Sequence, residues 1–236
     1  MSIRITSLFI AVVASVTAIN ASVPIIVSIG AGKRVAMSLS NKAEKQLENG
    51  DVAGAKHNVD AALQADPKYW PALYQRAEIF AMQGKYELAI QDCNEALRQY
   101  PTFVDASLLR ATINALFGKY AEALKELNYV ISLHPQRVTL GRALRQRAWL
   151  QATCPNPVFR NGQQAIKDAK AACSISEWRD ENTIDTLAAA YAETGDFDSA
   201  VRYAAQALAV NGIAPIDQKH IQKHLTLFQQ LQPIRL

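Results

Sequence analysis

The chain has 236 residues, of which 50% are hydrophobic and 19% are charged, and its formal net charge is +4 at pH 7. This length accommodates one or two domains, and the hydrophobic fraction is ample for a packed interior. The positive charge is spread thinly and forms no basic tract of the kind that follows nucleic acid, so composition argues against a nucleic-acid partner.

The stretch Ile5–Gly32 contains no charged residue and follows directly after Arg4. One interpretation is a cleaved signal peptide, with Leu8–Val16 as its apolar core and cleavage after Ala18 or Ala21. In that case the rest of the chain is exported.

The alternative is an uncleaved membrane anchor over Ile5–Ser28, which is long enough to cross a bilayer despite Pro24. The apolar run Val23–Val27 favours the anchor. Basic residues after the segment would then keep the rest of the chain in the cytoplasm; they are Lys33, Arg34, Lys42 and Lys45. Both interpretations stay open, so residues 1–35 are predicted to be a signal peptide or membrane anchor plus a joint. The chain is accordingly membrane-anchored or exported (periplasmic or secreted).

After this segment, three kinds of residue recur at intervals of 34 positions. They are Gly50, Gly84 and Gly118; Ala55, Ala89 and Ala123; and Pro67, Pro101 and Pro135. A period of 34 residues is typical of a helix–turn–helix solenoid. The glycines end the first helix of each pair, and the residues before the prolines are disfavoured in a helix, which separates one repeat from the next.

The clearest single repeat is Thr186–Leu208. Leu187, Ala190 and Tyr191 share one face of a first helix, and Gly195 is suited to end it. Asp196 can cap a second helix with its own apolar stripe. Small residues on both halves let the two helix backbones approach closely.

These residues resemble the tetratricopeptide repeat (TPR) family, of a bacterial type with an N-terminal signal or anchor segment. The match covers roughly Ala36–Asn211 and includes the small residues Ala43, Ala77 and Ala111 and the aromatic residues Tyr86 and Tyr120. The resemblance implies an all-α fold, a right-handed α-solenoid of about five helix–turn–helix repeats plus a C-terminal capping helix. The repeats fall near residues 36–69, 70–103, 104–137, 138–180 and 181–212.

The fourth repeat is irregular, because the step from Ala123 to Ala165 is 42 residues, eight more than the period. We assign three of the extra residues to the segment before a helix over Leu140–Thr153. The other five belong to the turn Cys154–Gly162, which contains two prolines. This turn is either a binding loop or a spacer.

Residues 213–236 are predicted to be a capping helix and a tail. Pro215 can begin the helix, whose apolar side consists of Ile216, Ile221, Leu225 and Phe228. His220 and His224 have the spacing of two zinc ligands, but no third ligand lies nearby, which favours a solvated helix face.

The sequence predicts no catalytic, cofactor-binding or metal-binding residue, and therefore no enzyme. Cys93, Cys154 and Cys173 are expected to be reduced and structural. Cys154 and Cys173 would lie near opposite ends of one helical hairpin, too far apart for a disulfide, and no histidine is placed to activate a thiol.

The TPR resemblance implies that first helices line a concave groove. The predicted groove residues are Tyr74, Glu78, Leu108, Thr112, Arg142, Arg145, Trp149 and Asp185. Arg142, Arg145 and Trp149 lie at i, i+3 and i+7, on one helix face. They would suit an acidic segment with an aromatic or aliphatic anchor. The alternative is that Trp149 packs in the core and the arginines are solvated.

The sequence leads to three hypotheses for the function. The first is a non-enzymatic scaffold that binds a peptide or protein surface in the groove. The second is an accessory or assembly subunit of a bacterial envelope complex, acting through its convex face and N-terminal segment. The third, an enzyme using the 154–162 insertion, lacks a suitable acid, base or nucleophile, because Arg160 serves none of these roles at neutral pH. A protein or peptide partner is expected in the first two cases, with membrane contact if the N-terminal segment is uncleaved.

Overall fold

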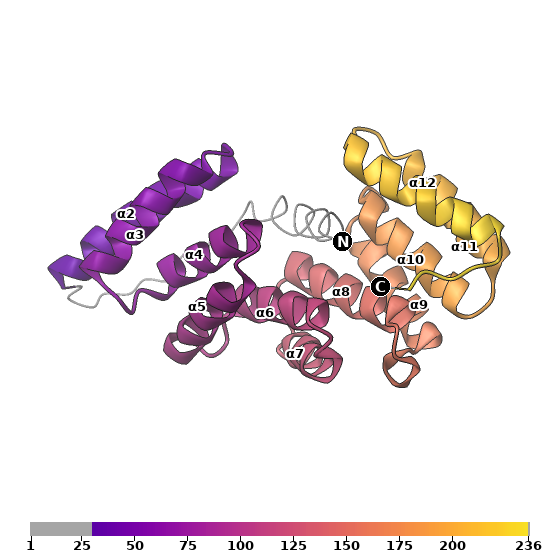
Figure 1. The fold of residues 1–236 in the computed structure, drawn as a ribbon, viewed down its shortest axis with the longest axis horizontal. Coiled ribbons are helices and arrows are strands. Elements are labelled where there is room, and N and C mark those ends of the chain that lie inside the picture. The colour runs from indigo at the N-terminus through magenta and orange to yellow at the C-terminus, as the bar shows by residue number, and fades with distance from the viewer. Residues whose placement is uncertain (1–29, 236) are drawn as a thin grey trace. The chain divides into compact units, whose positions relative to one another are not determined.

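The computed structural model describes residues 30–235, which contain eleven α-helices, one short 3₁₀ turn and no strand (Figure 1). The predicted all-α fold is therefore confirmed. The signal or anchor prediction for residues 1–29 lies outside this part of the chain. Every helix that is described is too short or too polar to span a bilayer.

The chain divides into two compact units, Met1–Arg110 and Ala111–Leu236, and the boundary falls within α6 (Val104–Leu116). The first unit contains two complete helical hairpins, in which α2 packs on α3 and α4 on α5. Their bounds are α2 (Ala31–Glu48), α3 (Val52–Ala65), α4 (Trp70–Met82) and α5 (Tyr86–Gln99). Contacts of α4 with both α2 and α3 join the two hairpins.

The second unit contains two more hairpins, α8 with α9 and α10 with α11, and ends with α12 packed mainly on α11. Its helices after α6 are α7 (Tyr120–Ser132), α8 (Arg137–Thr153), α9 (Gly162–Ile175), α10 (Glu181–Glu193), α11 (Phe197–Leu208) and α12 (Pro215–Gln229). A 3₁₀ turn, η1 (Pro157–Phe159), precedes α9. The helix α10 contacts α8, α9, α11 and α12, so it is the centre of this unit.

Four of the turns between paired helices share one backbone geometry, and the longer turn between α8 and α9 differs from them. The glycines of these four turns have positive φ: 77° at Gly50, 72° at Gly84, 73° at Gly118 and 81° at Gly195. At the second of these turns, the N–H of Gly84 donates to Ala81 O (3.0 Å) and the N–H of Lys85 donates to Phe80 O (2.8 Å). This pair of bonds satisfies carbonyls that a helix end leaves open. The predicted role of the recurring glycine is confirmed.

The recurring small residues lie where helices meet. The second-helix alanines are 0% exposed in every repeat: Ala55, Ala89, Ala123, Ala165 and Ala200. Their first-helix counterparts are at most 1% exposed: Ala43, Ala77, Ala111, Ala148 and Ala188. A side chain no larger than a methyl group at these positions permits the close approach of the two backbones.

Two helices begin earlier than the sequence indicated. Helix α2 starts at Ala31, so the last residues of the predicted joint are helical. A Cβ added at Gly32 would lie 2.5 Å from Ala65 O, so glycine allows α2 to lie against the end of α3. Helix α8 starts at Arg137 rather than Leu140. Its three extra residues lengthen the helix because nothing between Pro135 and Leu140 breaks it.

A set of buried ion pairs also follows the repeat but was not predicted. Arg147 on α8 forms a two-pronged pair with Asp168 on α9, with Nε 2.7 Å from Oδ2 and Nη2 2.9 Å from Oδ1. Its third nitrogen, Nη1, donates to Asn128 Oδ1 on α7 (2.7 Å). In the first unit, Arg76 holds Asp92 in the same way, at 2.7 and 2.8 Å. The asparagine position recurs at Asn94, which accepts from Arg110.

We expect overpacking when a buried alanine of the repeat is enlarged. Ala123→Leu should lower the free energy of unfolding by about 1–3 kcal/mol, because the larger side chain does not fit between the closely packed helices. Glu122→Leu at the exposed neighbouring position should change it very little. Thermal melts followed by circular dichroism compare the two, and equal shifts would contradict the register of the repeat.

Removing the arginine of a buried pair should cost more than overpacking does. Arg147→Ala leaves Asp168, whose side chain is 4% exposed, with a buried charge. Breaking such a pair costs about 3–5 kcal/mol. Arg179→Ala is the matched control, since that side chain is 82% exposed beside Glu177. Chemical denaturation of both variants measures the difference, and an Arg147 variant as stable as the control would refute the structural role of the pair.

Candidate functional site

Three helices of the second unit each place one side chain in a single cluster. Trp149 comes from α8, Asp185 from α10 and His224 from α12. The Nδ1 atom of His224 lies 2.7 Å from Asp185 Oδ2, and the His224 and Trp149 ring centroids are 5.7 Å apart. A carboxylate only accepts hydrogen bonds, so Nδ1 of His224 carries the hydrogen. We call the surface around these three residues the α8–α10–α12 face.

This face contains polar atoms with no partner in the described part of the chain. The indole Nε1 of Trp149 and Oδ1 of Asp185 are both buried and form no hydrogen bond there. The Gln146 amide, also on α8, contains two further buried atoms without partners there. Gln151 Oε1 is another, but it lies on the side of α8 that faces α9. A buried polar atom without a hydrogen bond is costly and uncommon. Their concentration on one helix is a feature that structural packing alone does not require.

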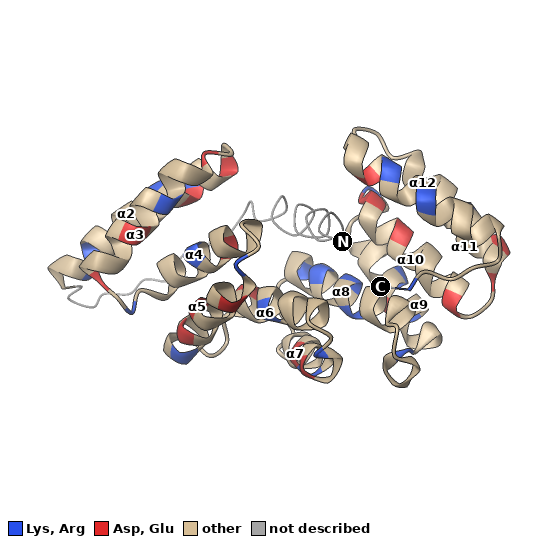
Figure 2. Cartoon of the chain, in the orientation of Figure 1, with Lys and Arg blue, Asp and Glu red and all other residues tan. Residues whose placement is uncertain are grey.

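The two predicted arginines lie on α8, N-terminal to Trp149, and both are half-buried. The helix α8 carries four arginines and no acidic residue (Figure 2). Burial lowers the pKa of the Arg145 guanidinium; Asp180 and Glu181 oppose this effect, whereas Arg142 adds to it. Within residues 30–235, no hydrogen bond or ion pair reaches Arg145. It is therefore a poorly solvated cation whose hydrogen-bond donors are available.

Acidic residues near Arg145 were not foreseen from the sequence. Burial raises the pKa of Glu181, with a further increase from Asp180 and a decrease from Arg145. Burial also raises the pKa of Asp217 at the start of α12. The α8–α10–α12 face is thus of mixed charge rather than uniformly basic.

The tail after α12 packs against this unit. The backbone reverses at Leu231, which has φ 57°, and the N–H of Gln232 donates to Leu227 O (2.9 Å). Ile234 is 7% exposed and belongs to the same apolar cluster as Ala152, Ala189 and Phe228. Arg235 Nη1 donates to Ala152 O (3.3 Å), and its Nη2 lies 2.6 Å from Glu193 Oε2. The sequence had predicted only a tail here.

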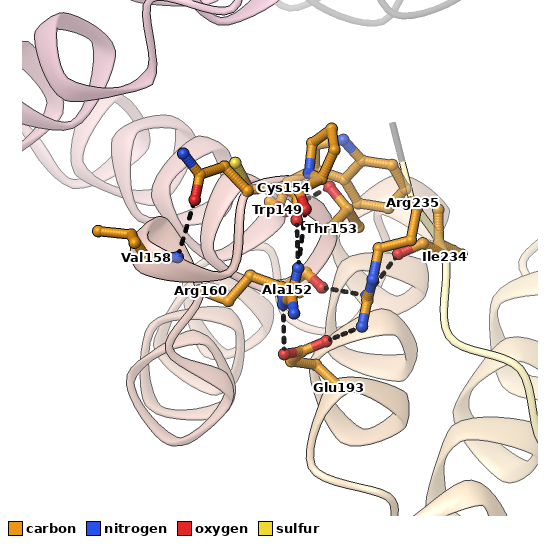
Figure 3. Close-up of polar contacts among 11 residues, drawn as sticks. Trp149, Ala152, Thr153, Cys154, Val158, Arg160, Glu193, Ile234 and Arg235 are labelled. Carbon is orange, nitrogen blue, oxygen red and sulfur yellow. Dashed lines mark hydrogen bonds and ion pairs between the residues drawn. The ribbon is translucent and has the colours of Figure 1, made fainter.

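The predicted insertion is held in place by Arg160, as Figure 3 shows. Its Nε donates to Glu193 Oε1 (2.8 Å), and its Nη1 donates to Cys154 O (3.0 Å) and Pro155 O (3.1 Å). Glu193 therefore lies between the guanidinium groups of Arg160 and Arg235. The Arg160 guanidinium is thus engaged in contacts that fix the turn.

The cysteines lie in the interior. Cys93, Cys154 and Cys173 are all 0% exposed. Cys154 and Cys173 are free thiols. Burial raises the pKa of Cys154, and it raises the pKa of Cys173 to about 12, with a further contribution from Asp180. Thiols held in this state are poor nucleophiles. In the described residues, no group of three His, Cys, Asp or Glu side chains is arranged to hold a metal ion.

The predicted groove residues fall into two groups. Arg142, Arg145 and Trp149 are half-buried, whereas the other five are buried: Tyr74 (7% exposed), Glu78 (6%), Leu108 (0%), Thr112 (8%) and Asp185 (4%). In the first unit the Tyr74 hydroxyl donates to Glu78 Oε1 (2.7 Å), and its ring packs edge-on against Phe103. In the second unit, His224 of α12 covers Asp185. The predicted apolar side of α12 is partly wrong, since Ile216 is 41% exposed.

A second feature lies on α9, α10 and α11. The rings of Trp178, Tyr203 and Tyr191 stack in series, with centroids 6.0 and 5.4 Å apart. Lys170 and Arg202 lie over the two tyrosine rings. Trp178 also lines a shallow surface cleft with Arg179 and Val210.

A family model described as tetratricopeptide repeat matches residues 41–102. A search of curated protein sequences gives no match.

Several solved structures share the fold. Against the APC/C hetero-tetramer Cut9–Hcn1, the TM-score is 0.69 and the identity 18%, over 83% of this chain and 36% of that one. This chain thus spans about a third of that protein's length. Against a thermophilic TPR protein of Thermus thermophilus, the values are 0.64 and 17%, over 81% of this chain and 100% of the other. YrrB, described as a TPR protein with an unusual peptide-binding site, gives 0.54 and 16%, over 80% and 92%.

Identities this low relate these proteins by fold alone. The recurring hairpins, the left-handed glycine turns and the buried alanines occur at the spacing that the family model matches over residues 41–102. Residues 41–102 thus match the tetratricopeptide repeat family, and the described residues share the fold of solved TPR proteins.

Proposed function

We propose that this chain is a non-enzymatic interaction scaffold that binds a peptide or protein surface on its α8–α10–α12 face. The observation that carries the proposal is the set of unsatisfied buried polar atoms on α8, next to an arginine with available donors. Because these atoms are buried, a bound segment would give them the partners that they lack in the described part of the chain by displacing the side chains that cover them. The description of YrrB as a peptide-binding TPR protein is consistent with this use of the fold.

The side chains of the face suggest the chemistry of its ligand. Planar guanidinium groups bind carboxylates through two parallel hydrogen bonds, and tryptophan offers a large apolar surface together with an N–H donor. Because Asp180 and Glu181 already lie near Arg145, the face suits one or two ligand carboxylates better than a long acidic run. We therefore propose an acidic segment that carries an aromatic or aliphatic anchor beside Trp149.

A second candidate is an accessory or assembly subunit of an envelope complex. The aromatic stack of Trp178, Tyr203 and Tyr191, flanked by Lys170 and Arg202, supports this alternative. Aromatic residues and arginine are enriched in protein interfaces. Attachment to the membrane or export through the N-terminal segment remains part of this proposal.

The two candidates predict different effects of substitutions. Arg145→Glu should weaken binding of the partner by about tenfold or more, because it removes a guanidinium group and introduces a carboxylate that repels a ligand carboxylate. Trp149→Ala should have a comparable effect, and Trp178→Ala, the control on the aromatic stack, should have little. The partner is first captured by affinity pull-down from the native membrane fraction, and isothermal calorimetry then measures each variant.

Circular dichroism and melting temperature establish that the variants are folded. Trp149→Phe keeps an aromatic ring but removes the indole donor, so it separates lost hydrogen bonding from a packing defect. Folded Arg145 and Trp149 variants that bind as tightly as the parent would rule out this face. Loss of binding only in the Trp178 variant would favour the second candidate.

A further inference from the structure

We propose that residues 232–235 form an internal ligand of this scaffold, which a partner segment carrying a branched aliphatic residue followed by arginine displaces. The tail contacts the ends of α8 and α10 through Arg235 (Figure 3). This inference rests on the proposed function, since it assigns a second part of the ligand to the same face.

The apolar part of the subsite belongs to the core of the second unit. Ile234 is 7% exposed and is a member of the apolar cluster that also contains Ala152, Ala189 and Ala192. Ala152 lies one helical turn after Trp149, so both are on the same side of α8. The subsite therefore accepts a branched aliphatic side chain, which Ile234 supplies here.

The polar part of the subsite is suited to a cation. Helix α8 ends at Thr153 and α10 ends at Glu193, and the C-terminal end of a helix carries partial negative charge. Arg235 contacts both ends, through Ala152 O on α8 and the Glu193 carboxylate on α10. A carbonyl at the end of α8 and the carboxylate of the last residue of α10 therefore converge on one guanidinium group.

The Glu193 carboxylate is divided between two arginines. Arg160 occupies Oε1 and is itself fixed by two carbonyls of the turn. Oε2 lies 2.6 Å from Arg235 Nη2, and this ion pair is its polar contact among the described residues. Oε1 thus binds Arg160 of the scaffold, and Oε2 binds the arginine of the tail or, after displacement, that of a ligand.

Two features make the docked tail displaceable. Leu231, where the backbone reverses, has a left-handed φ of 57° and is 67% exposed. This conformation is strained for a large residue. The Arg235 side chain is also 35% exposed. Covalent attachment gives the tail a high effective concentration, so a weak subsite stays filled until a partner with additional contacts competes.

The test uses the full-length chain and a synthetic peptide with the sequence of residues 231–236. The tail variant combines Ile234→Ser with Arg235→Glu, and Arg235→Glu alone is a milder version that retains the buried side chain. Lys223→Glu, a charge reversal at an exposed position of α12, is the matched control. Binding is followed by NMR through the tryptophan indole N–H resonances in ¹⁵N-labelled protein.

The peptide should bind both tail variants about tenfold or more tightly than it binds the parent or the Lys223 variant, because their subsite is open. Adding Glu193→Gln to the tail variant, or changing the arginine of the peptide to glutamate, should abolish most of this gain. Folded tail variants that bind the peptide no better than the parent would overturn the proposal.

Failure of this inference can be distinguished from failure of the proposed function. If the tail variants bind the peptide no better than the parent, but partner binding still depends on Arg145 and Trp149, only the internal ligand is ruled out. If the tail variants bind the peptide more tightly, but substitutions of Arg145 and Trp149 leave partner binding unchanged, the tail subsite stands and the proposed acidic ligand site is ruled out.

Discussion

A buried carboxylate on the second helix of a repeat has to be neutralised, and the arginine of the first helix does this. Arg76 with Asp92 and Arg147 with Asp168 are two-pronged pairs whose acidic side chains are 9% and 4% exposed. Such a pair has little rotational freedom, so it fixes how one helix is turned against the other. On α8, Arg147 points toward α9, and Arg145 and Trp149, two positions before and after it, lie on the opposite side of the helix. The pair therefore helps to determine which side chains α8 presents to α10 and α12.

The α8–α10–α12 face is assembled from segments distant in the sequence. His224 lies 39 residues after Asp185, and Arg235 lies 83 residues after Ala152. In a solenoid most contacts join neighbouring repeats, and here the capping helix and tail add contacts that span two repeats. Among residues 30–235, buried polar atoms on α8 have no hydrogen-bond partner, while Arg235 holds the adjacent ends of α8 and α10. Recognition sites are most precise when they are built on rigid elements of this kind.

The sequence predicted those features that depend on short-range spacing. The glycine turns and the buried alanines followed from the period of 34 residues. Charged and amide residues recur at the same period of 34: Asp60, Asn94 and Asn128, and also Arg76 and Arg110. The recurring polar contacts could therefore have been predicted by including these residue types in the comparison. Arg147 follows Arg110 by 37 positions, which is the period plus the three extra residues assigned before the helix of the fourth repeat.

The contacts of the non-repeating C-terminal segment could not be predicted in this way. No periodicity relates His224 to Asp185, or Arg235 to Glu193. The apolar stripe of α12 indicated a cap, but its rotation depends on packing, and Ile216 is exposed as a result. The acidic neighbours of Arg145 were missed because Asp180 and Glu181 precede and begin the next helix, outside the pattern used to choose groove residues.

Site-specific photo-crosslinking shows whether the partner binds the α8–α10–α12 face. A photoreactive amino acid is placed at Arg142 in one sample and at Trp178 in another, each in the full-length chain within native membranes. If the partner binds this face, it is captured from position 142 and not from position 178. Capture from position 178 alone, with both proteins folded and present at equal levels, would contradict binding at this face.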